Sequence, residues 1–249
     1  MGYSRQAIET LRGHMVDTGR NLTLAIDIGG TGLKASVVDE DARMLTDRVR
    51  VATPVGAPPA TFVEVLAGMV APLGAFDRVS VGFPGVVRDG RVLTAANLGN
   101  DMWKGFELAR ALEAALAKPV RVANDADLQG LAVIAGKGVE MVITLGTGFG
   151  TGLYLDGRLA PHLEIAHHPF RHGETYDEQL GNAARKEIGS ARWNKRVQRA
   201  IGNMRRLTWF DHLFIGGGNA KKIDFALEPD VTVISNEAGM EGGVALWRH

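Results

Sequence analysis

The chain has 249 residues, of which 45% are hydrophobic, so it is long enough to form one large domain or two smaller ones with a sizeable core. Lysine plus arginine and aspartate plus glutamate both number 28, so no overall positive charge favours nucleic acid as a partner. The chain contains no cysteine, which excludes disulfides, thiolate zinc sites and cysteine nucleophiles.

The first twenty residues give no sign of a targeting segment. They lack the apolar core of a signal peptide, and no apolar run in the chain reaches the length of a membrane span. Ile8, Leu11 and Met15 recur at helical spacing, so we expect a short leader helix or a frayed segment over 1–20. We therefore expect a cytoplasmic protein whose partners are neither membranes nor nucleic acids.

Residues 22–39 have the pattern of a hairpin with a glycine turn. An apolar, β-branched run ending at Ile28 predicts a buried strand, and the alternation after the turn predicts a second strand. Glycine lets backbone N–H groups approach a phosphate closely, and the turn consists of Gly29, Gly30, Thr31 and Gly32. Lys34 adds a cation, and Asp27 at the strand end suits a hydrated Mg²⁺.

Two other interpretations of this hairpin stay open. A glycine-rich turn is often no more than a turn. Residues 30–35 also fit the loose dinucleotide fingerprint, but that fingerprint opens a helix, whereas here the alternation continues as a strand. The P-loop pattern ending in Gly-Lys-Ser/Thr is absent.

Residues 142–157 repeat the pattern of strand, Gly-Thr-Gly, strand and closing aspartate, about 115 residues further on. The spacing from Gly-Thr-Gly to the aspartate differs by one residue between the two copies. We interpret them as an internal duplication with one phosphate loop in each half, the second formed by Gly146, Thr147, Gly148 and Gly150. Because the chain has 32 glycines, chance similarity of two turns is the alternative.

Further elements follow from hydrophobic periodicity and from glycine and proline boundaries. We expect strands at 48–53, 78–83, 120–123, 211–215 and 231–234, and a short hairpin at 86–93. We expect helices at 61–73, at 106–116, from after Asp127 to 135, over much of 173–207 and at 236–247. Thr61 is the expected N-cap of the first helix. A third glycine turn follows the strand at 211–215 and consists of Gly216, Gly217 and Gly218.

Asn124 and Asp125 stand between a predicted strand and a predicted helix. Asn or Asp in that place is commonly a helix N-cap. The alternative is that a carboxylate at a strand end removes a proton from a substrate hydroxyl. A loop around Asn97 and Trp103 has the polar and aromatic groups to grip a sugar, or is an ordinary surface loop.

Two charged segments follow the second hairpin. Glu164 and His167 are three residues apart and would share a face of a helical turn, and polar substrate contacts suit them better than a metal site. Residues 171–206 contain nine basic side chains, which form either a solvated helix face or a track for a polyanion: Arg171, Arg185, Lys186, Arg192, Lys195, Arg196, Arg199, Arg205 and Arg206.

Together the motifs resemble the ROK family of bacterial sugar kinases, and most of all its polyphosphate glucokinase branch. They occur in one order over 22–248: the Asp27 to Lys34 hairpin, Gly-Phe-Pro-Gly at 82–85, Asn124-Asp125, Gly-Thr-Gly-Phe-Gly at 146–150, Glu-Ile-Ala-His at 164–167 and Gly-Gly-Gly-Asn at 216–219. The resemblance implies an α/β protein with the actin-like ATPase (ribonuclease H-like) fold, in which a cleft separates two α/β domains.

The resemblance implies a domain at 21–123 with the first phosphate loop and a domain at 124–249 with the second and third glycine turns. In this arrangement the last helix packs back on the N-terminal domain. Asp125 would be the catalytic base, and the sugar would be bound by Gly85, Asn97, Asn124, Asp125, Glu164 and His167. The glycine turns and Lys34 would hold the phosphate donor, ATP or polyphosphate, with Mg²⁺ near Asp27 through water.

Three departures from the family pattern bear on these expectations. The cysteine-rich zinc motif of most ROK kinases is missing, so we expect no zinc, as in the polyphosphate branch. Ala166 replaces a usual glycine, and Pro169 stands where a further sugar-contacting glutamate is usual. The sequence therefore predicts a kinase for a hexose, with glucose as the first guess, and leaves the sugar, the donor and the oligomeric state open, although ROK kinases are commonly homodimers.

Other functions remain as alternatives. One is an ATP-dependent kinase for another hexose or a polyol. Another is an actin-like ATPase without a sugar substrate, against which Asn124, Asp125, Glu164 and His167 argue. A ROK-type transcriptional regulator would need an added DNA-binding domain, and we expect none within 1–20.

Overall fold

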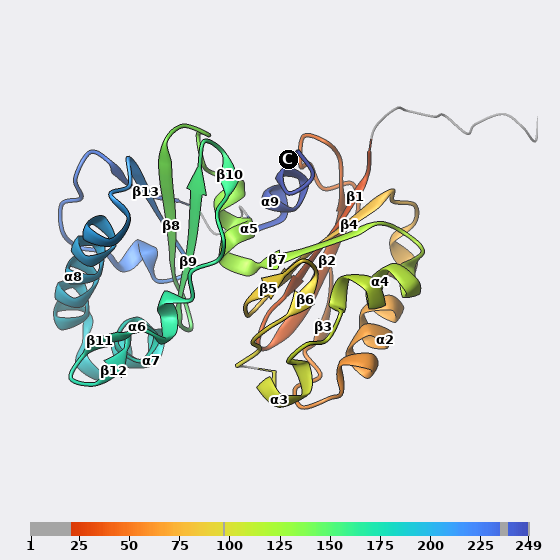
Figure 1. Cartoon of the computed structure of the whole chain (residues 1–249), viewed down its shortest axis with the longest axis horizontal. Helices are drawn as coiled ribbons and strands as arrows, with labels where there is room; N and C mark the ends of the chain where they lie inside the picture. The colour runs from red at the N-terminus through yellow and green to blue at the C-terminus, as the bar shows by residue number, and fades with distance from the viewer. Residues whose placement is uncertain (1–20, 97, 235–238, 249) are drawn as a thin grey trace, which may run out of the picture.

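A computed structural model describes residues 21–96, 98–234 and 239–248. The described chain folds into two lobes, each built around a five-stranded sheet (Figure 1). The expected leader at 1–20, Asn97 and the start of the expected last helix at 236–238 lie outside the described residues.

The N-terminal lobe contains a sheet of order β3-β2-β1-β4-β7. The pairs β1–β2 and β2–β3 are antiparallel, and β1–β4 and β4–β7 are parallel. Its strands are β1 (Thr23–Ile28), β2 (Gly32–Val38), β3 (Val49–Ala52), β4 (Arg78–Phe83) and β7 (Val120–Asn124). Alternate apolar side chains of β1 and β2 pack against helices α2 (Pro59–Val70) and α4 (Leu108–Leu116) in one buried cluster.

The C-terminal lobe repeats this plan with the order β10-β9-β8-β13-β14. Again the first three strands run antiparallel, and β8–β13 and β13–β14 are parallel. The strands are β8 (Val139–Leu145), β9 (Phe149–Leu155), β10 (Arg158–Leu159), β13 (His212–Gly216) and β14 (Val231–Val233). The matching order and directions of the two sheets agree with the predicted duplication.

The register of the two hairpins explains why the spacing from Gly-Thr-Gly to the closing aspartate differs by one residue between them. In the first, Ile28 pairs with Leu33, so four residues lie in the turn, whereas in the second Leu145 pairs with Phe149 and three lie in the turn. The second hairpin instead has one more register pair along its strands. The two copies therefore keep the same topology although turn and strand lengths differ.

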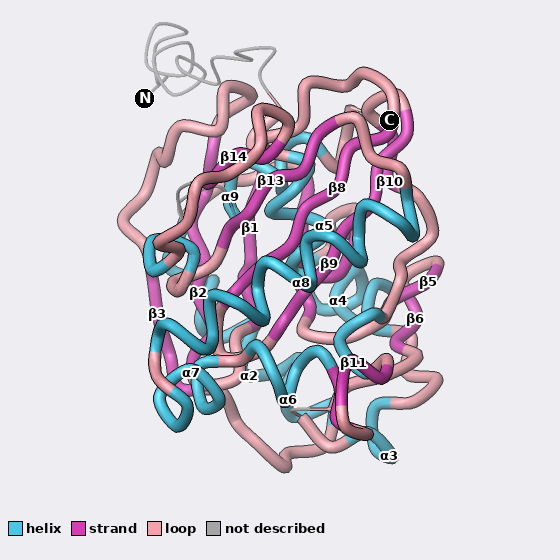
Figure 2. Tube along the Cα trace, turned by 90° about the vertical axis from the view of Figure 1, so that its left-hand side faces the viewer, coloured by secondary structure: helices cyan, strands magenta, loops and turns pink. Residues whose placement is uncertain are grey.

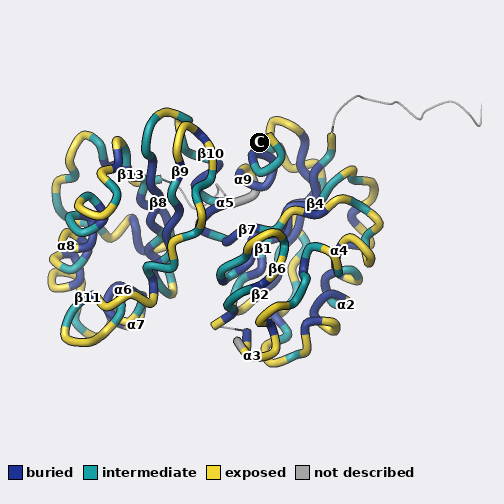
Figure 3. The backbone as a smooth tube through the Cα atoms, viewed as in Figure 1, coloured by how far each residue is buried: buried dark blue, intermediate teal, exposed yellow. Residues whose placement is uncertain are grey.

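Helix α8 (Ser190–Thr208) covers the C-terminal sheet, as Figure 2 shows. Its inward side chains include Trp193, Val197 and Met204, which pack with the strands in a second buried cluster. The inner faces of both lobes are buried, and the outer turns and helix faces are exposed (Figure 3). Each lobe thus has a core of its own.

Helices α5 (Asp125–Leu131) and α9 (Gly239–Ala245) lie between the two sheets (Figure 1). The two helices cross closely, because a Cβ on Gly242 would lie 1.7 Å from the backbone oxygen of Leu128. Helix α9 also contacts the N-terminal sheet, where the Ser80 hydroxyl donates to the Gly243 carbonyl at 2.5 Å. The last helix thus lies against the first lobe. The boundary between the two predicted domains, at residues 123 and 124, stays a prediction.

The remaining elements are short. They are β5 (Val87–Arg88), β6 (Arg91–Val92), β11 (Pro169–Arg171), β12 (Glu174–Thr175), α3 (Asn100–Trp103), α6 (Tyr176–Leu180), α7 (Asn182–Ile188) and the 3₁₀ turns η1 (Ala71–Leu73), η2 (Ile165–His167) and η3 (Ala220–Lys222). Among the described residues, no helix combines the length and apolarity needed to cross a membrane.

The predicted strands and helices that fall on described residues are present in the predicted order, with boundaries shifted by a few residues. The helical segment expected over much of 173–207 is three helices, α6, α7 and α8, and the short elements β10, β11, β12 and α3 were not predicted. The expected N-cap Thr61 is wrong, because α2 begins at Pro59, after Pro58, with no side-chain cap. Proline is preorganised for the first helical position and has no N–H that needs a partner there, so the helix begins earlier than the polar residue suggested.

Candidate active site

A cleft of about 780 Å³ lies between the lobes, and both lobes line it. The walls include most of the predicted site residues: Asp27, Gly29, Gly30, Thr31, Lys34, Gly85, Asn124, Asp125, Gly146, Thr147, Gly148, Gly150, Glu164, His167, Gly217 and Gly218. Gly32 and Gly216 are not on these walls. Residues that are far apart in the sequence are therefore brought to one cavity.

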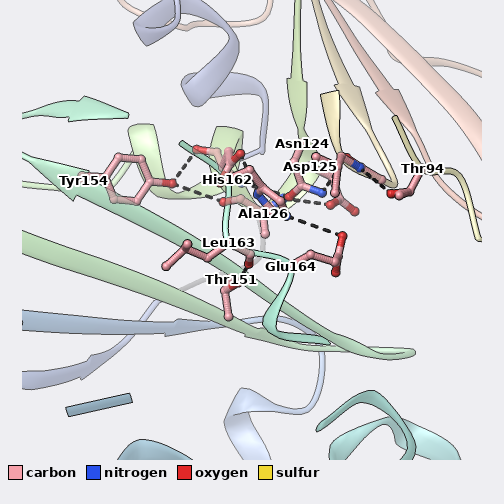
Figure 4. Close-up of polar contacts among 12 residues, drawn as sticks. Thr94, Asn124, Asp125, Ala126, Thr151, Tyr154, His162, Leu163 and Glu164 are labelled. Atoms are coloured by element: carbon pink, nitrogen blue, oxygen red, sulfur yellow. Dashed lines mark hydrogen bonds and ion pairs between the residues drawn. The ribbon is translucent and has the colours of Figure 1, made fainter. Parts of the chain in front are cut away.

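Asn124 and Asp125 join strand β7 to helix α5 at the floor of the cleft (Figure 4). The Asn124 side-chain oxygen accepts hydrogen bonds from the backbone N–H groups of Ala126 and Asp127, so this residue is the N-cap. Its amide nitrogen donates to the Gly85 carbonyl at 3.1 Å. An amide nitrogen has two hydrogens, so one donor is left for a ligand.

Asp125 is a carboxyl group of the cleft with a raised pKa. Its Oδ1 accepts a hydrogen bond from the N–H of Ala126 at 2.9 Å. Burial, together with the negative charge of Asp27, raises the pKa of Asp125 to about 7. A carboxylate with this pKa is basic enough to take a proton from a hydroxyl near neutral pH.

A buried histidine connects helix α5 to the Glu164 segment. His162 Nδ1 lies 2.9 Å from Oδ2 of Asp127, and its Nε2 lies 3.6 Å from Oε2 of Glu164. Burial lowers the pKa of His162, but the two carboxylates outweigh it and raise that pKa to about 10. His162 is therefore an imidazolium at neutral pH, and it holds the pKa of Glu164 below its usual value.

Gly85 is confined by its neighbours. A Cβ at this position would lie 2.1 Å from the Thr94 backbone oxygen, so only glycine fits without a shift of the chain. The carbonyl of Gly85 is the acceptor for Asn124, and the N–H of Val86 donates to the Thr94 hydroxyl. This turn packs tightly against the residue that caps α5.

The first glycine turn stands at the cleft beside a charge pair. Lys34 Nζ donates to Asp27 Oδ2 at 2.9 Å, with side chains 35% and 43% exposed. The Thr53 hydroxyl donates to the Gly29 carbonyl at 2.6 Å and holds the turn in place. Both charged side chains are thus accessible from the cleft.

Asp27 fits a magnesium ion that travels with a phosphate donor. Mg²⁺ is commonly bound through one or two carboxylates, several waters and substrate phosphates rather than by a closed protein cage. An accessible carboxylate next to a glycine turn supplies that donor chemistry. In the part of the chain that the structure describes, no group of three or more His, Asp or Glu side chains could hold a metal ion.

The second glycine turn is held by the side chains of Asp177 in α6 and of Asn219, which follows the third turn. A Cβ on Gly148 would lie 2.0 Å from Asp177 Oδ1, which accepts from the N–H of Phe149 at 2.7 Å. The Asn219 amide donates to the Gly146 carbonyl at 3.0 Å. In the third turn, Gly217 has a positive φ of 89° and has no room for a side chain.

None of the nine basic residues of 171–206 lines the cleft. Several have partners elsewhere in the C-terminal lobe: Arg205 pairs with Asp230 and Glu228, Arg196 donates to the Gln179 carbonyl, and Arg199 lies over the ring of Phe170. This segment is mainly an exposed helix face with local contacts.

Several cleft residues were not singled out as site residues by the sequence: Arg48, Gln129, His162 and Asp177, together with Asp127, which lies behind the cleft wall in contact with His162. Asp127 and His162 are 35 residues apart, and only the fold brings them into contact. The cluster of histidines around Glu164 was the available signal, but spacing could not show which of them faces α5. Pro169, by contrast, is an exposed residue of β11.

Comparisons with known proteins agree with this architecture. The ROK family profile matches residues 23–165. A polyphosphate glucokinase of Mycobacterium tuberculosis (strain CDC 1551 / Oshkosh) is 33% identical over 208 residues, which cover 80% of this chain and 78% of that protein. An N-acetylmannosamine kinase of Escherichia coli O139:H28 is 37% identical over 144 residues, covering 55% of this chain and 48% of that protein.

Solved structures of sugar kinases superpose on most of the chain. The inorganic polyphosphate/ATP-glucomannokinase from Arthrobacter sp. strain KM superposes with a TM-score of 0.80 at 32% identity, covering 92% of this chain and 100% of that one. A ROK glucokinase from Streptomyces griseus, in complex with glucose and AMPPNP, has a TM-score of 0.70 at 22% identity and covers 91% and 99% of the two chains.

The two duplicated lobes and the cleft between them define an α/β protein of the actin-like ATPase fold, as the resemblance implied. The chain belongs to the ROK family.

Proposed function

We propose that the protein is a phosphotransferase that moves a phosphoryl group from polyphosphate or ATP to a hydroxyl of a hexose, with glucose as the first candidate. The observation that carries this proposal is the placement of Asp125. It is a half-buried carboxylate whose pKa is raised to about 7, in one cleft with the glycine turns of both lobes and with Glu164. Relatives with polyphosphate glucokinase and polyphosphate/ATP-glucomannokinase activity support the same reaction.

In this mechanism Asp125 orients a sugar hydroxyl and removes its proton as the oxygen attacks the terminal phosphoryl group. The bond between that phosphorus and its bridging oxygen breaks, and ADP or the shortened polyphosphate leaves. Phosphoryl transfer needs little covalent help, so most of the catalysis is positioning and charge stabilisation. A base with a pKa near the working pH is effective in this role, and such help accounts for about 10²–10⁴ in rate.

The sugar lies in this proposal against Gly85, Asn124, Glu164 and His167. The free amide hydrogen of Asn124 donates to one sugar hydroxyl, and Glu164, kept ionised by His162, accepts from others. Asn97 remains a predicted sugar contact outside the described residues.

The donor phosphates lie against the glycine turns, including Gly32 and Gly216 next to the cleft wall. Backbone N–H groups and Lys34 balance the charge that develops on the transferred group. Mg²⁺, held near Asp27 through water, would add positive charge to the phosphates. We place the protein in the cytoplasm as a homodimer, as its ROK membership suggests.

The test is a product assay with purified protein, Mg²⁺ and a panel of hexoses, each with ATP and with polyphosphate. Formation of a hexose phosphate from either donor is the expected result. Donor hydrolysis that no sugar accelerates would contradict the proposal and would indicate an actin-like ATPase. Turnover of only another hexose or a polyol would correct the sugar and keep the reaction.

A further inference from the structure

Two arginines that the reaction above does not use, Arg48 and Arg50, lie at the edge strand β3 of the N-terminal sheet, next to the cleft. Val49 and Val51 of β3 pack against the core of the lobe, so Arg50 lies on the opposite face of the sheet, and Arg48, the residue before β3, lines the cleft. Arg50 stands opposite Lys34 in the register of β2 and β3, and Lys34 stands opposite Asp27. Arg50 therefore extends the charged row of Asp27 and Lys34 beside the first glycine turn, and Arg48 lies just before it in the chain.

Both arginines lie close to the donor site. Arg48 is among the residues that line the cleft. The guanidinium of Arg50 covers Gly32, because a Cβ there would be 2.9 Å from its Nε. Neither Gly32 nor Arg50 is on the cleft wall itself, so Arg50 lies beside the first turn at the edge of the cleft.

The two guanidinium groups are exposed and are not neutralised by carboxylates within the described chain. Lys34, by contrast, is paired with Asp27. The basic run at 171–206 contributes nothing to the cleft walls. The cationic charge without a carboxylate partner beside the first turn is thus that of Arg48 and Arg50.

We propose that Arg48 and Arg50 form a subsite for the phosphates of a linear polyphosphate beyond the group that is transferred. The inference rests on the proposed function. Guanidinium forks match phosphate oxygens in geometry and stay charged at any working pH. A polyphosphate has charges all along its length, whereas the charges of ATP end at three phosphates, so a cationic row continuing past the turn distinguishes the two donors.

Exposed arginines on an edge strand also have a purely structural role, since they discourage pairing with other strands. That role does not depend on the donor. A readout that compares donors therefore separates the two explanations.

The experiment compares the wild type with the double variant Arg48→Gln/Arg50→Gln and with Arg192→Gln. The last is a matched control, because Arg192 is an exposed arginine of α8 away from the cleft. KM and kcat are measured with glucose for long-chain polyphosphate, tripolyphosphate and ATP over a range of salt concentrations. Binding of long-chain polyphosphate without sugar is measured by calorimetry, and melting temperatures report folding.

The double variant should raise KM for long-chain polyphosphate by about tenfold and leave KM for ATP within about twofold. The dependence of log KM on log salt should become shallower by about one for each arginine removed, and Arg192→Gln should match the wild type. The double variant Arg48→Lys/Arg50→Lys, which keeps both positive charges, should keep part of the wild-type KM advantage for long-chain polyphosphate.

Equal effects on ATP and polyphosphate, or no effect on either, would overturn the inference. So would a wild-type enzyme that uses ATP and neither uses nor binds polyphosphate. If no hexose is phosphorylated by any donor, the proposed function fails instead, and polyphosphate binding that depends on Arg48 and Arg50 would still support the subsite.

Discussion

At the scale of single residues, His162 links the base helix to the sugar-facing carboxylate. Its imidazolium has Asp127 on one side and Glu164 on the other, and its side chain is only 6% exposed. Asp127 is itself buried, and its Oδ1 has no hydrogen-bond partner among the described residues. The ion pair is therefore the main compensation for a charge taken out of water.

The variant His162→Gln should lower the free energy of unfolding by about 3–5 kcal/mol, because it leaves the buried Asp127 carboxylate without its partner. It should also raise KM for the hexose, since Glu164 loses the group that orients it. Denaturant unfolding and KM measure the two effects, with the exposed His168→Gln as control. A double variant that also carries Asp127→Asn should recover part of the stability, and additive losses would contradict the coupling.

The raised pKa of Asp125 makes a prediction for pH dependence. The base must be ionised, and its pKa of about 7 means that kcat/KM should rise from about pH 6 to pH 8 with an apparent pKa near 7. A pH–rate profile with saturating donor measures this. A profile that is flat over the range, or that falls with rising pH, would show that another group limits the reaction.

At the scale of elements, helix α9 depends on glycine where it crosses α5. A Cβ on Gly242 would meet the Leu128 backbone at 1.7 Å, whereas Gly68, exposed in α2, has nothing within 4 Å of its own position. Alanine is about 1 kcal/mol better than glycine in a helix when there is room for it. Both are helical glycines, but an added Cβ would clash at Gly242 and would meet open space at Gly68.

Gly242→Ala should lower the melting temperature, and Gly68→Ala should raise it. Calorimetry or circular dichroism on both variants measures the shifts. Equal stabilisation by both substitutions would mean that α9 moves away from α5 at no cost, contrary to the close crossing described.

The elements themselves were largely predictable, because the signals that specify them are local. The strand and glycine patterns around Gly29 and Gly146 predicted both hairpins, and the polar pair at 124–125 predicted a helix start. The contact between Asp127 and His162 was not predictable, since it joins segments that only the tertiary fold brings together. The placement of the 171–206 basic run away from the cleft likewise depends on how α8 packs, which composition does not reveal.

At the scale of the whole molecule, two lobes share a cleft and are linked through α5 and α9. Closure of the lobes over a bound sugar would exclude water from the phosphoryl group. We therefore expect ATP hydrolysis without sugar to be much slower than hexose phosphorylation. We also expect small-angle scattering to show a smaller radius of gyration once a hexose that is a substrate is added. Equal hydrolysis with and without sugar, and an unchanged radius, would argue against closure.

The most direct test of the central claim is the rate of hexose phosphate formation by Asp125→Asn beside the wild type. Both proteins would be given the same sugar, donor and Mg²⁺ at about pH 8, with sugar binding measured in parallel by calorimetry. The account predicts that the rate falls at least by the factor of about 10²–10⁴ that general-base help contributes, and that sugar binding is largely retained. An Asp125→Asn enzyme that phosphorylates hexose at a rate near that of the wild type would contradict it.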